Sequence, residues 1–329
     1  MQRLNSWHAV LATVFAFLLN VQQHDFVQAD EPAIRSVTDL ERIPVGIKVV
    51  QSPEMAKAVK KLPVDGRRGE YSWVYRTEVT ALDKDLTIVE FGAFHWDGAE
   101  WQLGPTSNGT PYGTKEFAEW YSCEDGVLKK GQSASDPVNW NSLDELVPGK
   151  AKWFFIGMDE TGKKYRGDAV VEFAPELGER SPLEPLVRFS GHWKKQWKLL
   201  PSEWIPAGQS ASGTHSGHWS LNGRFLKEEG QDSDGSTYLS MYSYDEAASQ
   251  YLLTVFQSRG ATTRMTGTWD EEKLTMTWRN TEQPGLTSEW KYRLVDSERY
   301  EFEFVTRGDD KKLYLHIKGT ADRVVDGNQ

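Results

Sequence analysis

The sequence predicts a mainly β protein with two antiparallel domains. From Tyr71 onward, apolar and polar residues alternate with the period of two that half-buried strands show. In the first half, the predicted strands follow one another too closely for crossover helices to lie between them, which favours an antiparallel β-sandwich. In the second half, turn signals recur about every 8–12 residues, as in a barrel or sandwich.

The first predicted domain covers residues 70–173 and follows a leader at residues 30–69. In the leader we expect one short helix at residues 53–62, because Pro53 suits a first helical turn and lysines fill the last one. Asp97-Gly98 between strand-type residues indicates a hairpin. Residues 117–121 indicate a helical turn, and the strands of this domain are expected at 71–79, 86–94, 151–158 and 164–173.

A linker is predicted at residues 174–185, which hold three prolines, a glycine and four charges without apolar periodicity. The second domain is predicted at residues 186–324, with a tail at 325–329. It has eight or nine expected strands, enough to close a small barrel with a modest interior. Asn222-Gly223 is the expected tip of one of its hairpins.

The start of the chain has the pattern of a secretory signal peptide. Arg3 precedes an apolar run at residues 9–21, and Val27-Gln28-Ala29 is a small-residue cleavage pattern. We therefore expect residues 1–29 to be removed and the protein to be exported to the periplasm or the extracellular space. The alternative is an uncleaved membrane anchor; after cleavage, no remaining stretch is long and apolar enough to span a bilayer.

Charge and cysteine content exclude several classes of function. The chain has 38 Lys and Arg against 48 Asp and Glu, a net charge of −10, so no nucleic-acid partner is expected. Its one cysteine, Cys123, rules out an intrachain disulfide and thiolate zinc sites. Because its neighbours are acidic, Cys123 is expected to be a buried structural thiol.

Three stretches of the second half resemble the family called domain of unknown function 1579. They are Gly213-Thr214-His215-Ser216-Gly217-His218-Trp219 through Leu226, then Tyr242-Ser243-Tyr244-Asp245, then Gln250-Tyr251 through Gly267-Thr268-Trp269-Asp270. The resemblance covers roughly residues 186–324 and implies a lipocalin-like β-barrel. It departs from the family at Ser243, where glycine is usual, and in the ending before Arg323. The family has no established catalytic residues, and we recognise no comparable resemblance for residues 30–185.

Gly191-His192-Trp193 is similar to the Gly-x-Trp opening of calycin barrels. The resemblance implies that Trp193 plugs the closed end of the barrel. It also implies that a cationic side chain of the last strand, Arg323 or Lys318, packs on the Trp193 ring as a cation–π pair.

The family resemblance, together with a strand count that could leave a cavity, implies a non-enzymatic protein that binds a small apolar or amphiphilic ligand in the barrel interior or mouth. Seven residues are the candidates for ligand contact: Trp219, Phe225, Tyr242, Tyr244, Phe256, Trp278 and His316. No cofactor is expected; the alternative is haem held by an interior His316, as in barrels resembling nitrobindin.

Other functions remain open as alternatives. The 14 tryptophans suit a carbohydrate- or surface-binding module, and Trp140 and Trp204 lie in loop-like sequence where exposure is expected. His215 and His218 are a weak metal pair, because spacing of three on a strand places them on opposite faces. A hydrolase using His192, His215 or His218 is a third reading that no motif supports. The sequence does not indicate an oligomeric state.

Overall fold

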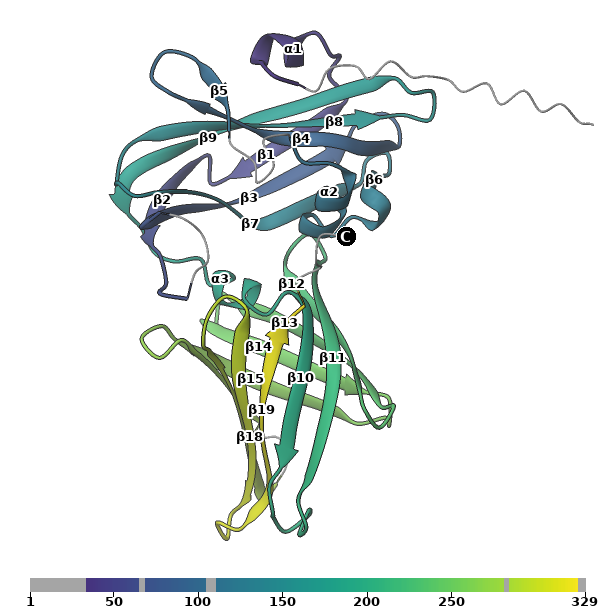
Figure 1. Cartoon of the computed structure of the whole chain (residues 1–329), viewed down its shortest axis with the longest axis vertical. Coiled ribbons are helices and arrows are strands. Elements are labelled where there is room, and N and C mark those ends of the chain that lie inside the picture. Colours follow the sequence, from purple (N-terminus) through teal and green to yellow (C-terminus); the bar gives the residue numbers. More distant parts are fainter. Residues whose placement is uncertain (1–33, 65–68, 105–110, 281–283, 325–329) are drawn as a thin grey trace, which may run out of the picture. The chain divides into compact units, whose positions relative to one another are not determined.

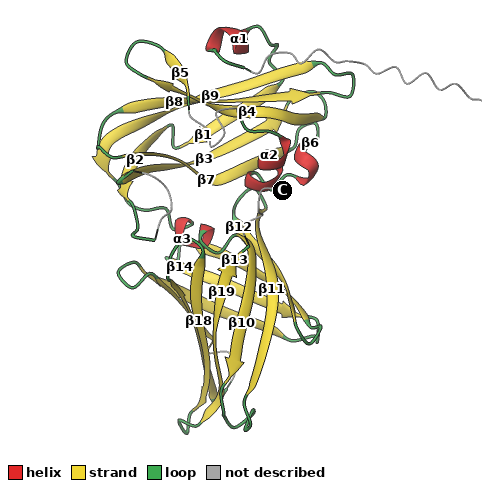
Figure 2. Cartoon of the chain, in the orientation of Figure 1, coloured by secondary structure: helices red, strands yellow, loops and turns green. Residues whose placement is uncertain are grey.

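The computed structural model describes residues 34–64, 69–104, 111–280 and 284–324. The predicted signal peptide at 1–29 and the predicted tail at 325–329 lie outside the described residues. The described chain is mainly β, as predicted, and forms a nine-stranded sheet followed by a closed ten-stranded barrel (Figures 1 and 2). No helix among the described residues is long and apolar enough to cross a membrane.

The first sheet has the strand order β1-β3-β2-β9-β8-β4-β5, with β6 paired to β4 and β7 to β3. Its pairings are antiparallel except for the parallel pair of β2 and β9. The strands are β1 (Ile47–Ser52), β2 (Met55–Lys60), β3 (Tyr71–Ala81), β4 (Leu86–Trp96), β5 (Trp101–Leu103), β6 (Val127–Leu128), β7 (Ser133–Leu143), β8 (Gly149–Met158) and β9 (Lys164–Leu177). The helices are α1 (Val37–Glu41), α2 (Thr114–Trp120) and the 3-10 turn Glu124–Gly126.

This sheet curls over its own core. The indole N–H of Trp153 on β8 donates to the hydroxyl of Tyr75 on β3 at 2.7 Å, although two strands separate β8 from β3 in the sheet order. The indole N–H of Trp73 likewise donates to the carbonyl of Ala174 on β9 at 2.8 Å. The sandwich-like packing predicted for this half is therefore made by one curled sheet.

The helix predicted at residues 53–62 is wrong, because Met55–Lys60 form β2. Ala56 and Ala58 are fully buried while Met55 and Lys57 are exposed, which is the alternation of a strand. Pairing with both β3 and β9 satisfies the backbone there. The helical turn predicted at 117–121 belongs to α2, and β9 continues to Leu177, into the predicted linker.

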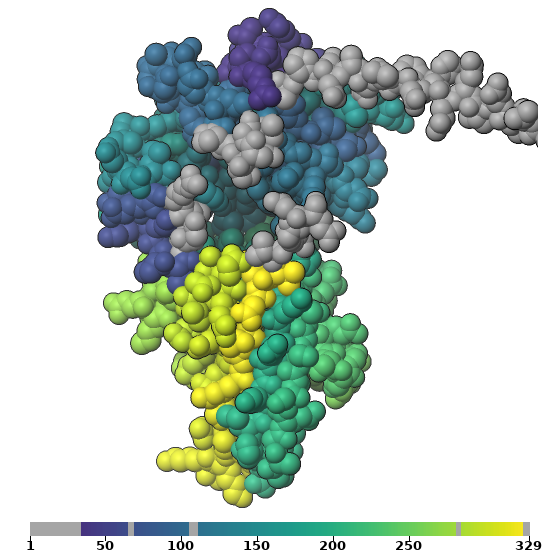
Figure 3. Space-filling model, viewed as in Figure 1, coloured from purple at the N-terminus to yellow at the C-terminus, as the bar shows by residue number. Residues whose placement is uncertain are grey.

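The barrel follows the short helix α3 (Glu184–Val187). Each strand pairs antiparallel with the next, and the first pairs with the last, so the sheet has no free edge. It has ten strands, one more than the upper prediction: β10 (Gly191–Leu199), β11 (Gln209–Ser220), β12 (Phe225–Asp232), β13 (Thr237–Asp245), β14 (Gln250–Gln257), β15 (Thr262–Asp270), β16 (Thr275–Asn280), β17 (Leu286–Leu294), β18 (Arg299–Gly308) and β19 (Leu313–Arg323). In the space-filling view the yellow last strand lies beside the teal first strand (Figure 3).

One end of the barrel is closed by Trp193 and Arg323, which face each other across the β10–β19 pair. The guanidinium of Arg323 lies 4.3 Å from the centre of the Trp193 ring and donates to the carbonyl of Ser190 at 2.8 Å. Gly191 has φ +92°, and a Cβ there would lie 2.5 Å from Arg323 Nη1. Lys318, the other predicted partner of Trp193, instead pairs with Glu303 at 3.1 Å.

We expect Arg323→Lys to lower the free energy of unfolding by about 1–3 kcal/mol. A lysine keeps the charge but not the planar group that reaches the Trp193 ring and three backbone carbonyls at once, those of Ser297, Ser190 and Arg188. Urea unfolding followed by tryptophan fluorescence measures the loss. Arg299→Lys is the control, since Arg299 is exposed and makes only a 3.5 Å ion pair with Asp322. Equal losses in both variants would contradict this role for Arg323.

Candidate ligand cavity in the barrel

A cavity of about 310 Å³ lies inside the barrel. Ser236 and Thr237, where the turn after β12 leads into β13, line it together with Ser258 and Arg259 of the turn after β14. In an up-and-down barrel that begins at Trp193, these turns lie at the end away from the Trp193–Arg323 closure. The closed end is therefore filled by side chains, while the other end encloses space.

Most of the cavity wall is apolar and aromatic. Its apolar lining consists of Trp197, Val255, Met265, Trp290, Phe302, Phe304, Leu315 and Ile317, all facing inward from their strands. Gly319 makes room for one of these rings, because a Cβ there would lie 2.5 Å from Cζ of Phe302. Such a wall favours an apolar or aromatic ligand body.

Charged and phenolic side chains form one polar corner of the cavity. The ammonium of Lys195 donates to the Tyr238 hydroxyl at 2.5 Å, and that hydroxyl donates to Oε1 of Glu228 at 2.9 Å. The Tyr242 hydroxyl donates to Oε2 of Glu228 at 3.1 Å. The Tyr238 ring crosses the backbone at Gly230, where a Cβ would lie 2.3 Å from its Cζ. Only glycine at 230 permits this chain of hydrogen bonds.

Burial shifts the pKa values of the titratable groups in this corner. It lowers the pKa of His215 to about 4, with Glu228 opposing the shift, so the imidazole is neutral at pH 7. Its Nε2 lies 3.5 Å from the Tyr300 hydroxyl and 3.8 Å from Glu228. Burial also lowers the pKa of Lys195 and raises that of Tyr238 well above its usual value. The phenol therefore stays protonated and able to donate.

Two polar atoms on the cavity residues have no hydrogen-bond partner among the described residues. One is the indole N–H of Trp290, a donor. The other is Oδ1 of Asp232, an acceptor whose carboxyl pKa is raised by burial. Since buried polar groups are normally paired, these atoms are available to a bound molecule.

None of the seven residues predicted to contact ligand lines this cavity. Trp219, Tyr242 and Trp278 belong to the packed core, and Tyr244 packs against Tyr251 with ring centres 5.0 Å apart. Of these, Tyr242 touches the polar corner through Glu228.

The interior positions predicted for Phe225 and Phe256 are corrected by the structure. On β12 the buried Leu226 faces the core, and on β14 Val255 does, so their neighbours Phe225 and Phe256 point outward. His316 lies between the cavity residues Leu315 and Ile317 on β19, so its side chain points to the opposite face of the strand. Its Nε2 forms a hydrogen bond with Oε1 of Glu303 at 2.7 Å. His316 therefore lies on the outer face, where it does not line the cavity.

None of the residues that line the cavity was predicted from the sequence, and these include the charged residues Lys195 and Glu228. Charged residues in strands are usually assigned to the solvent face. The available signal was parity, because Lys195 lies two residues from both Trp193 and Trp197, and Glu228 lies two residues from Leu226. Side chains at i and i+2 share one face of a strand.

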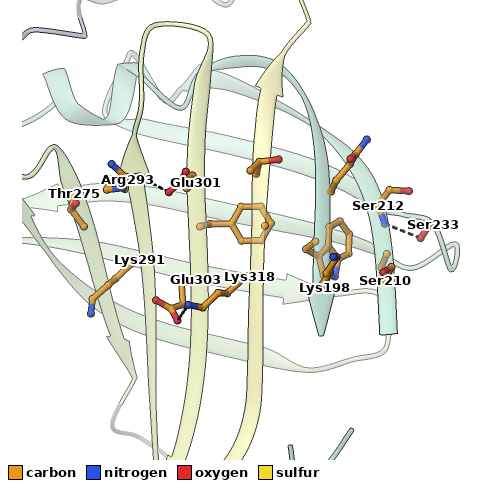
Figure 4. A pocket seen from close by; sticks show the side chains of 16 residues that line it. Lys198, Ser210, Ser212, Ser233, Thr275, Lys291, Arg293, Glu301, Glu303 and Lys318 are labelled. Carbon is orange, nitrogen blue, oxygen red and sulfur yellow. Dashed lines mark hydrogen bonds and ion pairs between the residues drawn. The ribbon is translucent and has the colours of Figure 1, made fainter. Parts of the chain in front are cut away.

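A larger groove of about 860 Å³ follows the outside of the barrel, and both of its carboxylates, Glu301 and Glu303, are held in ion pairs (Figure 4). Arg293 pairs with Glu301 at 2.6 Å, and Lys318 pairs with Glu303 at 3.1 Å. These pairs are about half exposed, and solvent-exposed ion pairs are weak recognition elements. The interior cavity is the stronger candidate site.

The remaining candidates carry no assembled site. His215 is buried while His218, three residues on, is exposed on the other face of β11, and the described residues contain no group of three or more His, Cys, Asp or Glu placed to hold a metal. Cys123 is buried, and burial raises the pKa of its thiol to about 11. Trp140 on β7 is 43% exposed and Trp204 in the loop after β10 is 50% exposed.

Comparison with known proteins shows similarity of fold alone. No family model and no curated protein matches the chain. Several solved structures are similar, including these three. Rv2717c from M. tuberculosis shares 13% identity at a TM-score of 0.34, over 45% of this chain and 100% of that one. The S-type phycobiliprotein lyase CPES from Guillardia theta shares 9% identity at a TM-score of 0.33, and the match covers 46% of this chain and 96% of that one. A DUF3598 protein of unknown function from Nostoc punctiforme shares 10% identity at a TM-score of 0.28, and the match covers 85% of this chain and 96% of that one.

We expect the barrel to lose stability as pH falls from about 6.5 towards 4. The unfolded chain protonates His215 below about 6.5, whereas the folded chain resists protonation until about 4. Between pH 7 and pH 5 this group alone contributes a loss of about 2 kcal/mol. Urea unfolding at both pH values should show a smaller loss for His215→Gln. His316→Gln, on the outer face, is the control, and an unchanged pH dependence in His215→Gln would refute the assignment.

Proposed function

We propose that this chain is a non-enzymatic binding protein that holds a small amphiphilic ligand inside the C-terminal barrel. The observation that carries the proposal is the cavity of about 310 Å³ in the barrel interior, with an aromatic wall and one polar corner. This volume is at the lower end of the range of small-molecule sites, which are mostly apolar with a few placed polar groups. The relation to domain of unknown function 1579 is part of the same proposal.

The cavity lining offers a ligand two kinds of surface, an apolar wall and a few polar groups. The aromatic wall that includes Trp197, Trp290 and Phe302 contributes affinity in proportion to the apolar area that a ligand buries. The unpaired indole N–H of Trp290 and the ammonium of Lys195 select a ligand that carries a hydrogen-bond acceptor. A ligand with an apolar body and one acceptor group satisfies both.

Carbohydrate or surface binding through exposed tryptophans is the second candidate, favoured by the exposure of Trp140 and Trp204. The two rings belong to different elements, β7 and the loop after β10. Trp204 is accompanied by Tyr314, whose ring centre lies 5.6 Å away. Single exposed rings supply less contact area than the continuous aromatic wall of the cavity, so we rank this function second.

The neutral fluorophore 1-aminoanthracene tests the binding function. We expect its fluorescence to rise on addition of the mature protein, and Val255→Phe to weaken its binding by about tenfold or more, because the added ring occupies the cavity. Thr254→Phe is the matched control, since Thr254 is the adjacent outward-facing residue of β14. Equal binding by wild type and Val255→Phe would place the probe elsewhere and contradict the proposal.

We further propose that the protein is exported, on the strength of the signal-peptide pattern. Expression of the full sequence in a bacterium should yield a mature chain that begins at Asp30, because the small-residue pattern ends at Ala29. Intact mass and amino-terminal sequencing of the periplasmic fraction measure this. An uncut chain in the membrane fraction would instead support the anchor.

A further inference from the structure

Lys195 has few partners for a lysine that faces the interior of a barrel. Its ammonium makes one hydrogen bond among the described residues, to the Tyr238 hydroxyl. Otherwise it lies over two aromatic rings, 4.5 Å from the centre of Tyr238 and 5.6 Å from that of Trp197. No carboxylate oxygen of a described residue lies within ion-pair distance of its nitrogen, and it lines the cavity.

The partner of Lys195 is the first member of a proton path. Tyr238 accepts from Lys195 at 2.5 Å and donates to Glu228 at 2.9 Å. A concerted shift along these two bonds moves a proton from the ammonium to the Glu228 carboxylate, while Tyr238 gives up one proton and receives another. The result is a neutral amine beside an aromatic wall, which is the form in which lysine acts as a nucleophile.

We propose that Lys195 captures an aldehyde with an apolar or aromatic body as an imine inside the barrel. The inference rests on the proposed cavity function and goes beyond it, because the ligand is held covalently. An aldehyde suits the lining, since its carbonyl oxygen is a neutral acceptor beside a donor-rich corner and its body meets Trp197, Trp290 and Phe302.

The reaction balances without an oxidant or a reductant. The Lys195 nitrogen attacks the carbonyl carbon, a C–N bond forms, and the carbonyl π electrons move to oxygen, which takes up a proton. One of the two amine protons supplies the proton on that oxygen, which gives a carbinolamine. The proton stored on Glu228 is then passed through Tyr238 to the carbinolamine hydroxyl, the C–O bond breaks, and water leaves as the nitrogen lone pair forms the C=N bond. The second nitrogen proton returns through Tyr238 to the Glu228 carboxylate. The net change is one aldehyde and one amine giving one imine and one water.

The surroundings of Lys195 favour this chemistry over a permanent ion pair. The titratable groups that surround it are Glu228 and Asp232 on β12, His215 on β11, Tyr238 on β13 and Tyr300 on β18. The two carboxylates raise the pKa of Lys195, but burial outweighs them and the net shift is downward. His215 and the tyrosines are neutral at pH 7. The amine is therefore freer to deprotonate than an exposed lysine.

Reductive trapping tests the proposal with the mature protein, benzaldehyde and sodium cyanoborohydride at pH 7. We expect peptide mapping to find one benzyl group on Lys195 before any other lysine, with a rate advantage of about tenfold for each unit by which its pKa is lowered. Lys194 and Lys198 are internal controls, because both are exposed on the outer face of β10. Modification of Lys195 no faster than these two overturns the proposal.

A second variant tests the proton path. Substitution of Glu228 by an amide has two opposing effects on trapping at Lys195. Loss of the negative charge favours the neutral amine and speeds trapping, whereas loss of the proton acceptor slows trapping. We expect Glu228→Gln to slow trapping at Lys195 by about tenfold or more. A rate that is unchanged or faster overturns the path.

The 1-aminoanthracene titration separates this proposal from the one on which it rests. Binding of the fluorophore to wild type but not to Val255→Phe, together with no selective trapping at Lys195, leaves the cavity as a binding site and overturns the imine. Failure of the fluorophore to bind, together with selective trapping at Lys195, supports the reactive lysine and removes the non-covalent function.

Discussion

The barrel depends on the pairing of its first strand with its last. Trp193 of β10 lies opposite Arg323 of β19, and the guanidinium packs on the indole while it binds the carbonyls of Ser190 and Arg188. The pairing of β10 with β19 closes the sheet and removes its free edges, and the Trp193–Arg323 contact fills one end of the interior. The volume that remains lies towards the other end, so the same contact that stabilises the barrel also determines where a ligand fits.

Closure places charges in an interior that water does not freely reach. A buried charge is costly unless hydrogen bonds satisfy it, and here tyrosine hydroxyls provide them. Within the described part of the chain, Glu228 accepts hydrogen bonds from Tyr238 and Tyr242, whereas the Lys195 ammonium donates one, to the Tyr238 hydroxyl. The carboxylate is thus well stabilised and the amine is not. An apolar residue at 195 would pack without this cost, so stability alone does not account for the lysine.

Single residues show which sequence predictions agree with the structure and why others do not. Asn222-Gly223 predicted a hairpin tip, and both residues have the positive φ, +57° and +70°, that such turns require. The helix predicted at 53–62 failed, because its alanines and lysines have high helix propensity and only contacts with β3 and β9 make β2 a strand. Phe225 and Phe256 were placed inside because apolar character was weighed above parity. Lys195 was overlooked for the same reason, because its charge was weighed above its position in the alternation of the strand.

The sequence by itself determined the strand content, the antiparallel turns and the Gly191-x-Trp193 opening, because all of these are local properties of neighbouring residues. It also contained the parity that aligns Lys195 with Trp193 and Trp197. Only the tertiary structure decided that ten strands close and that the first sheet curls over its own core, since both depend on pairings between residues far apart in the chain. The tertiary structure also decided that Lys195, Tyr238 and Glu228 come together from three strands. Hydrogen bonds between residues far apart in the chain follow from strand register and barrel closure, and they leave no local pattern in the sequence.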